Sequence, residues 1–181
     1  MIDSLWVSLR SSAVFSDCGK YRYLLTRKVG PNDRAACFIM LNPSMADADR
    51  DDPTIRKCLG FARRWGCGWL IVANLFALRA TNPAELRRAR DPVGPLNRRW
   101  IQEAVKCTIR AGHAADQGLV ICAWGTVGSY ALQDRVVLRW IESVCTPLTL
   151  GLTQNGSPRH PLYVPYGAEP VSFVVGGREM P

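Results

Sequence analysis

Short apolar runs alternate along this chain with segments whose apolar residues recur at helical spacing. Four runs contain almost no polar residue: 35–41 (AACFIML), 69–73 (WLIVA), 119–124 (LVICAW) and 148–152 (LTLGL). Runs of this kind are typical of strands that are buried on both faces of a parallel sheet. Two further strands are expected, one at 21–27 and a short one at 171–175.

The segments between the runs predict helices. Asp52 suits an N-cap and Pro53 the first helical position, so a helix is expected to begin there. Other helices are expected from Asn82, over about 96–110 and over about 126–144. This order predicts an α/β fold: a three-layer αβα sandwich with a central, mostly parallel four-stranded sheet plus an N-terminal strand or hairpin. A chain of 181 residues fits a single domain that spans its whole length.

The ends of the apolar runs are the expected place for a site. In open parallel sheets, ligands bind at the carboxyl ends of the strands. Asn42, Asn74 and Gly125 each follow directly on a run, and the last run leads into a loop that reaches His160. We therefore expect these residues to gather at one rim of the sheet.

The charge balance indicates a class of partner. The chain carries a net charge of +8 at pH 7, and 19 of its 23 basic residues are Arg. The planar guanidinium group matches phosphate oxygens, so DNA is the expected partner. The alternative is that these arginines cover solvated helix faces.

Several other function classes find little support. No apolar run approaches the roughly 20 residues of a membrane span, and residues 1–10 lack the pattern of a signal peptide, so a cytoplasmic protein without membrane contact is expected. The seven cysteines are odd in number and form no C-x-x-C pair, which argues against a disulfide framework, a zinc knuckle or an iron–sulfur cluster. No metal, cofactor or obligate protein partner is expected.

Four short motifs at the strand ends resemble those of the uracil-DNA glycosylase superfamily, in particular its mismatch-specific branch. The motifs are FIMLNPS at 38–44, IVANLF at 71–76, AWG at 123–125 and RHPLY at 159–163. The resemblance implies a uracil-DNA glycosylase-like fold and a DNA glycosylase that flips out a damaged or modified pyrimidine, hydrolyses its N-glycosidic bond and leaves an abasic site. The segments NLFALRAT, DDPTIRKC and RHPLYVP also resemble an uncharacterised bacterial domain family, over about residues 15–166.

The resemblance and the chemistry of the reaction give the catalytic candidates their roles. Asn42 is expected to position the attacking water, as in the mismatch-specific branch, and His160 to donate a hydrogen bond to the departing base. The most active branch has Asp at the turn where this chain has Asn42, so a nearby carboxylate is the expected base. The candidates for this carboxylate are Asp47, taken first, and then Asp49, Asp51 and Asp52.

Other residues are expected to bind the substrate. The amide of Asn74 both donates and accepts, so it can pair with the edge of a pyrimidine. Phe76 and Trp124 are candidates to stack on the base, although buried aromatic residues more often belong to the core. Ser44, with the small residues after it, leaves room for a base larger than uracil, including a hypermodified phage base. The candidates for contacts with the DNA backbone are Arg56, Arg79, Arg159 and Ser157.

Alternatives stay open for both the residues and the function. Asn42 and Asn74 can be ordinary strand-end residues that satisfy backbone groups. The same site can serve a hydrolase or transferase of free nucleosides or nucleotides, and the chain can also be a catalytically silent nucleic-acid-binding module. Repair and antiviral defence are not separated by the sequence. His113, the other histidine, follows a helix and is expected to cap it.

Overall fold

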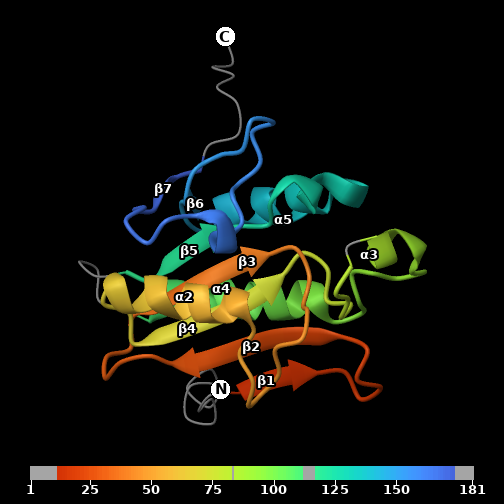
Figure 1. The fold of residues 1–181 in the computed structure, drawn as a ribbon, viewed down its shortest axis with the longest axis horizontal. Helices are drawn as coiled ribbons and strands as arrows, with labels where there is room; N and C mark the ends of the chain where they lie inside the picture. The colour runs from red at the N-terminus through yellow and green to blue at the C-terminus, as the bar shows by residue number, and fades with distance from the viewer. Residues whose placement is uncertain (1–11, 83, 112–116, 174–181) are drawn as a thin grey trace.

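The structure is a computed structural model that describes residues 12–82, 84–111 and 117–173, and these residues form a mixed sheet with helices on both faces (Figure 1). Within the described residues the sheet has seven strands in the order β1-β2-β4-β3-β5-β6-β7. The strands are β1 (Ser12–Phe15), β2 (Arg22–Lys28), β3 (Ala35–Met40), β4 (Trp69–Asn74), β5 (Leu119–Cys122), β6 (Leu148–Thr149) and β7 (Val171–Ser172). His113 and residues 174–175, for which the sequence made predictions, lie outside the described residues.

The centre of the sheet is parallel. β3 pairs in parallel with β4 on one side and with β5 on the other, and β5 pairs in parallel with β6. These are the strands that the apolar runs predicted, and every residue of β3 and β4 is buried. β2 joins β4 antiparallel, β1 joins β2 antiparallel, and β7 joins β6 antiparallel. The expected α/β class is thus confirmed, but the sheet is wider than four strands and mixed, because β1 and β2 extend one edge and β7 the other with antiparallel pairing.

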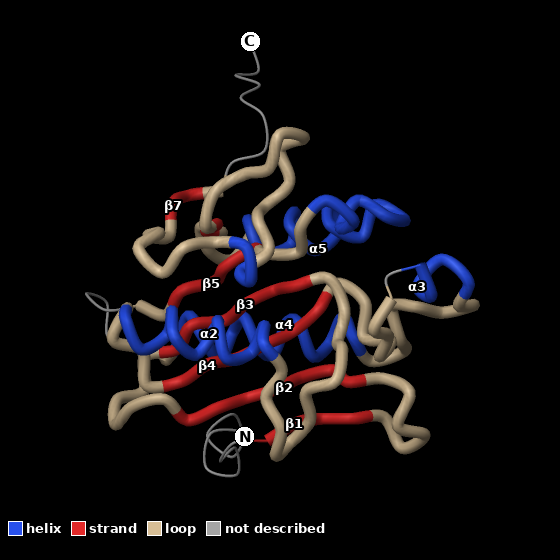
Figure 2. The backbone as a smooth tube through the Cα atoms, viewed as in Figure 1, coloured by secondary structure: helices blue, strands red, loops and turns tan. Residues whose placement is uncertain are grey.

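The helices cover both faces of the sheet (Figure 2). They are α2 (Pro53–Arg64), α3 (Ala84–Arg88), α4 (Asn97–Arg110) and α5 (Gln133–Glu142), with the 3₁₀ helices η1 (Thr126–Leu132) and η2 (Pro161–Tyr163). Residues of α2 belong to the core on one face, and residues of α4 and α5 belong to the core on the other. Among the described residues, no helix has both the length and the apolar character that crossing a membrane requires.

Aromatic stacking fixes α2 on its face of the sheet. Phe38 of β3 lies 5.9 Å from the ring of Trp65, and Phe61 of α2 lies 5.1 Å from the same ring, both as stacked pairs. Because these side chains are at most 9 % exposed, their burial stabilises the fold and holds the C-terminal end of α2 against β3.

Two predicted elements differ from the structure. The helix expected over 126–144 is divided into η1 and α5, because Ala131 and Leu132 adopt left-handed backbone angles with φ of 52° and 56°. The strand expected over 148–152 ends at Thr149. Gly151, two residues later, has φ of +106°, a conformation that a glycine adopts without strain and that turns the chain out of the sheet.

The end of β4 is held by a buried side chain of α4, which gives a first prediction. Asn97 is fully buried, and its Nδ2 donates to the carbonyl oxygens of Asn74 and Leu75, each at 2.9 Å. We expect Asn97→Ala to lower the free energy of unfolding by about 2 kcal/mol, because buried carbonyls lose their donor. Urea unfolding checks this, with the exposed Arg99→Ala on the same helix as a control that changes stability by less than about 0.5 kcal/mol. Equal stability of the two variants would contradict the prediction.

Candidate functional site

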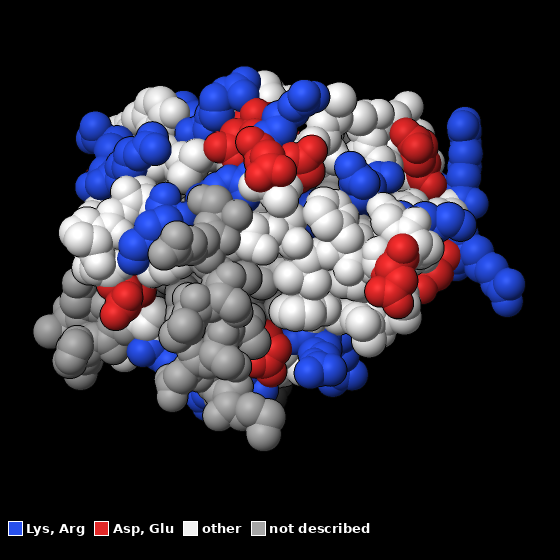
Figure 3. All heavy atoms as spheres, turned by 90° about the horizontal axis from the view of Figure 1, so that it is seen from below, with Lys and Arg blue, Asp and Glu red and all other residues white. Residues whose placement is uncertain are grey.

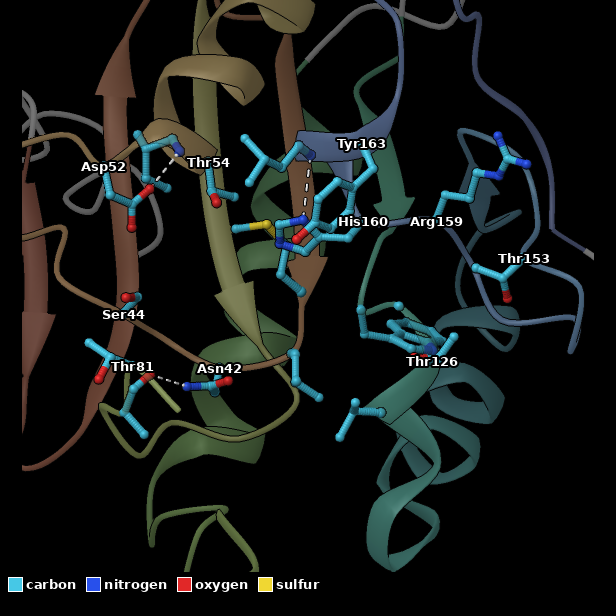
Figure 4. A pocket seen from close by; sticks show the side chains of 18 of the residues that line it. Asn42, Ser44, Asp52, Thr54, Thr81, Thr126, Thr153, Arg159, His160 and Tyr163 are labelled. Atoms are coloured by element: carbon cyan, nitrogen blue, oxygen red, sulfur yellow. Dashed lines mark hydrogen bonds between the residues drawn. The ribbon is translucent and has the colours of Figure 1, made fainter. Parts of the chain in front are cut away.

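A cavity of about 690 Å³ opens beside the carboxyl ends of β3 and β5 (Figure 4). Its polar lining residues are Arg22, Asn42, Ser44, Asp52, Thr54, Thr81, Thr126, Thr153, Arg159, His160 and Tyr163. They come from the start of β2, the loop from β3 to α2 and the first turn of α2, the segment after β4, the segment after β5, and the loop after β6 that leads into η2. The rim rule for parallel sheets therefore placed the cavity correctly.

Asn42, directly after β3 and Leu41, presents an acceptor to the cavity. Its Nδ2 donates to the carbonyl oxygen of Pro43 at 3.0 Å and to that of Ala80 at 2.8 Å. Both amide hydrogens are thereby used, which leaves Oδ1 as the group that can accept a hydrogen bond from a water or a substrate. Through these two hydrogen bonds, Asn42 also connects the loop after β3 to the loop after β4. It can therefore stabilise the turn and still take part in the candidate site.

Asp52 supplies the carboxylate of the cavity. As the N-cap of α2, it accepts a hydrogen bond at Oδ1 from the backbone N–H of Ile55 at 2.9 Å. One oxygen is used in this cap, and the carboxylate as a whole lines the cavity. The sequence identified Asp52 as a cap and as one of several possible bases. In a parallel α/β unit the helix begins at the rim where the preceding strand ends, which is why this cap lies at the site.

His160 contributes a neutral donor. Its Nδ1 accepts a hydrogen bond from the backbone N–H of Leu162 at 3.4 Å (Figure 4). This arrangement assigns the proton of the neutral imidazole to Nε2. The loop is fixed to the end of β5, since the N–H of Gly125 donates to the carbonyl of Pro158 at 2.9 Å. The ring of Tyr163, which is 79 % exposed, lies 5.8 Å from the imidazole ring.

The environment of His160 predicts how stability depends on pH. Burial lowers the pKa of His160, and the negative charge of Asp52 opposes this effect to a smaller extent. The folded state therefore binds fewer protons than the unfolded state. Above the unfolded-state pKa of about 6.5, His160 therefore does not change the free energy of unfolding. As the pH drops from there towards the folded-state pKa, the protonation of His160 lowers the free energy of unfolding.

We expect wild-type stability to fall more between about pH 7.5 and about pH 5 than that of His160→Asn, which lacks the ionisable ring. Asn is chosen because its side-chain oxygen can replace Nδ1 as the acceptor for Leu162. Urea midpoints of both proteins at the two pH values check this. The same pH dependence in both would show that the imidazole is not responsible.

The structure does not bring Asn74 and Phe76 to the cavity. Beyond β4 the chain continues alongside the extension of β3: the N–H of Leu75 donates to the carbonyl of Met40, and that of Phe76 to Leu41, at 2.8 and 2.9 Å. Asn74 is therefore enclosed inside the sheet rather than at its edge, is 1 % exposed, and has a buried Nδ2 without a partner. Phe76 is fully buried and packs against Tyr130.

The other predicted acid, Asp47, shapes a turn instead of lining the cavity. Its Oδ1 accepts from the N–H groups of Asp49 and Arg50 at 3.0 and 2.8 Å. These hydrogen bonds lower the pKa of Asp47. Asp47, the first carboxylate candidate of the sequence, therefore does not line the cavity, whereas Asp52 does.

Ser44 and Trp124 do line it, but in different ways. Ser44 is half-buried in the loop that follows β3. Trp124 is 3 % exposed and packs edge-on against Phe173, so its ring belongs mainly to the core. Ser157 does not line this cavity and accepts at its carbonyl from Thr153 within the preceding loop.

Of the three predicted phosphate-binding arginines, only Arg159 lines the cavity. Its Nε donates to the carbonyl of Leu152 at 3.0 Å, and the side chain is exposed. Arg56 is exposed on α2 and donates to the carbonyl of Asp51. Arg79 donates to the carbonyl of Gly19 and lies over the ring of Phe15.

The basic side chains do not form a single patch on the face seen in Figure 3. Lys and Arg lie at several separate places around the outline, with acidic side chains between them. On this face the basic side chains therefore do not form one continuous surface.

Sequence reasoning missed Arg22 and Thr81 as residues of the cavity. Arg22 was assigned only to a strand, and the available signal was a charged residue between the aromatic residues Tyr21 and Tyr23 where that strand begins. Among the described residues, no group of three or more His, Cys, Asp or Glu side chains is arranged to hold a metal ion.

Comparison with known proteins gives one match. The family model described as "Protein of unknown function (DUF1643)" matches residues 22–162, which include the cavity residues from Arg22 to Leu162. No curated protein and no solved structure matches the chain. Because the match covers well over half of its length, the chain belongs to the DUF1643 family.

Proposed function

We propose that the protein hydrolyses N-glycosidic bonds and acts on a modified pyrimidine nucleotide of DNA that is flipped into the cavity. The observation that supports this most is the set of groups on one cavity: the carboxylate of Asp52, the acceptor oxygen of Asn42 and the neutral imidazole of His160. Hydrolysis of such a bond needs a base, a group that holds water and a donor for the departing base.

In the proposed reaction, a water held by Oδ1 of Asn42 attacks C1′ of the sugar while the C1′–N bond breaks. The carboxylate of Asp52 takes a proton from this water, and the oxygen stays on C1′. The electron pair of the broken bond leaves with the base, whose negative charge accepts a hydrogen bond from Nε2–H of His160. The proton from Asp52 reaches the base through solvent, so the products are an abasic sugar and the free base.

The size and rim of the cavity support a large substrate. A volume of about 690 Å³ lies within the range of about 300–1,000 Å³ found for pockets that enclose a whole small molecule, which is more than a bare pyrimidine ring requires. Tyr163 and Leu162 are exposed at the cavity, where aromatic and apolar surfaces can stack on unpaired bases. A uracil-DNA glycosylase-like arrangement of the four parallel strands is part of this proposal, supported by the position of the cavity at their carboxyl ends.

The test is base excision from defined oligonucleotides. Single- and double-stranded oligonucleotides that carry uracil, hydroxymethylated pyrimidines or glycosylated pyrimidines are incubated with the full chain, and alkali then cleaves at abasic sites. We expect cleavage with a bulky modified pyrimidine, and none with the double variant Asp52→Asn, His160→Asn. Excision of uracil alone would remove the larger-base proposal, and intact oligonucleotides throughout would count against a DNA glycosylase.

A second candidate is hydrolysis of a free nucleotide. It is favoured because, of Arg56, Arg79 and Arg159, only Arg159 lines the cavity, whereas a protein that grips a DNA backbone needs several basic side chains around its site. Release of base from nucleoside monophosphates, with all oligonucleotides left intact, would select this function over the first.

A further inference from the structure

Arg22 is a buried cation on the wall of the cavity. It is the first residue of β2, its side chain is among the largest that are fully buried, and the residue is 2 % exposed. Its Nη1 donates to the carbonyl oxygen of Ala46 at 2.7 Å, which leaves Nε buried without a hydrogen-bond partner. Arg22 nevertheless lines the cavity. A donor that is both buried and unused thus belongs to a side chain that faces the proposed substrate.

No carboxylate of the described residues forms an ion pair with Arg22 within 4.0 Å, whereas Arg27 of the same strand pairs with Asp51 at 2.9 Å. The negative charges of Asp52 and Asp47 act on Arg22 from farther away, and the positive charges of Arg79 and Arg27 oppose them. Burial lowers the pKa of Arg22 to about 10, so the guanidinium stays charged at neutral pH.

A buried positive charge with an unused N–H donor lowers the stability of the fold unless a ligand neutralises the charge and accepts the hydrogen bond. The neighbouring Arg27 shows the contrast. It is also buried in β2, and its Nε, Nη1 and Nη2 all have partners: Asp51, the carbonyl of Thr26 and the carbonyl of Asp47. Two arginines of one strand hold the same loop, yet only Arg22 faces the cavity and keeps a free donor.

We propose that Arg22 binds an oxyanion of the substrate, which enters the cavity and takes the free Nε edge of the guanidinium. This edge presents two parallel N–H groups, which match the paired oxygens of a phosphate or carboxylate. That the oxyanion belongs to a nucleotide rests on the proposed function. Its source is then either the phosphate of the nucleotide or an acidic substituent on the modified base.

The experiment measures binding rather than turnover. The full chain is titrated by calorimetry with inorganic phosphate, a pyrimidine nucleoside monophosphate and the matching nucleoside. The variants are Arg22→Met, which removes the charge and keeps an apolar chain in the buried position, and Arg22→Lys, which keeps the charge but not the planar fork. The control Arg63→Met removes one positive charge at an exposed position of α2 that does not line the cavity.

We expect inorganic phosphate to bind the wild type at least tenfold more tightly than Arg22→Met, with Arg22→Lys between them. Arg63→Met should change this affinity by less than threefold. If the monophosphate binds at least tenfold more tightly than the nucleoside, and only in proteins that keep Arg22, the phosphate is the source. Equal affinity for nucleoside and monophosphate, with phosphate binding still dependent on Arg22, assigns the oxyanion to the base.

A folded Arg22→Met that binds phosphate as tightly as the wild type would overturn the proposal, and so would a wild type that binds no phosphate. The far-ultraviolet circular dichroism and urea midpoint of each variant establish that it is folded. The outcome is independent of the proposed reaction: Arg22-dependent binding without any excision would leave this inference in place and remove the glycosidic activity.

Discussion

Asp52→Asn is expected to lower the rate of base excision at least about a hundredfold, the effect typical of losing a general base. The substitution removes the charge and the proton-accepting capacity of the only carboxylate among the described residues that line the cavity. It preserves the cap of α2, because Asn is as good an N-cap as Asp and can accept from Ile55 in the same way. Single-turnover excision on the oligonucleotide that the wild type cleaves measures the effect.

Asp47→Asn is the matched control for this prediction. Asp47 lies in the same loop and also accepts backbone hydrogen bonds, but it does not line the cavity. We expect its rate to stay within about threefold of the wild type, since Asn keeps the turn that the acid forms. A large loss in Asp47→Asn with little loss in Asp52→Asn would restore the carboxylate that the sequence favoured and refute the one assigned from the cavity.

His160→Asn is expected to lower excision by about a hundredfold to ten-thousandfold, because the leaving base loses the donor that stabilises its negative charge. Asn can keep the hydrogen bond from Leu162 that begins η2, so the loop retains its shape. The loss should shrink for substrates whose base is a better leaving group, since these need less help from a donor. Rates on a series of pyrimidines with different acidity provide this measurement.

If His160 had only a structural role, a different result would be expected. The excision rate of His160→Asn would then fall by the same factor on every substrate, in proportion to its loss of stability. Comparing the urea midpoints of the wild type and His160→Asn separates loss of folding from loss of the donor. The comparison is made at about pH 7.5, where the wild-type imidazole is neutral in both the folded and the unfolded state.

The apolar runs predicted the centre of the fold because a strand buried on both faces has apolar residues at every position, instead of alternating apolar and polar residues. All of β3 and β4 are buried, as such runs require. The edges were harder to predict. β1 and β7 contain four and two residues, and their pairing depends on neighbours that local sequence does not specify. The division between η1 and α5 likewise depends on backbone angles at Ala131 and Leu132, residues with no local preference for them.

The candidate site was predictable where strand ends meet the rim, and not where the chain continues past them. Asn42 and His160 line the same cavity as expected. Asn74 also ends a strand, but the next two residues keep pairing with the extension of β3 and enclose it. Arg22 was missed because only tertiary packing reveals that its one hydrogen bond leaves Nε unused.

Whether the cavity hydrolyses a glycosidic bond is measured most directly by running the reaction in water labelled with heavy oxygen. Mass spectrometry of both products then shows where the solvent oxygen goes. The proposed mechanism predicts one labelled oxygen on the sugar carbon and none on the released base, with neither product formed by Asp52→Asn, His160→Asn. Label in the base, or no release of base from any oligonucleotide or nucleotide by the folded wild type, would contradict it.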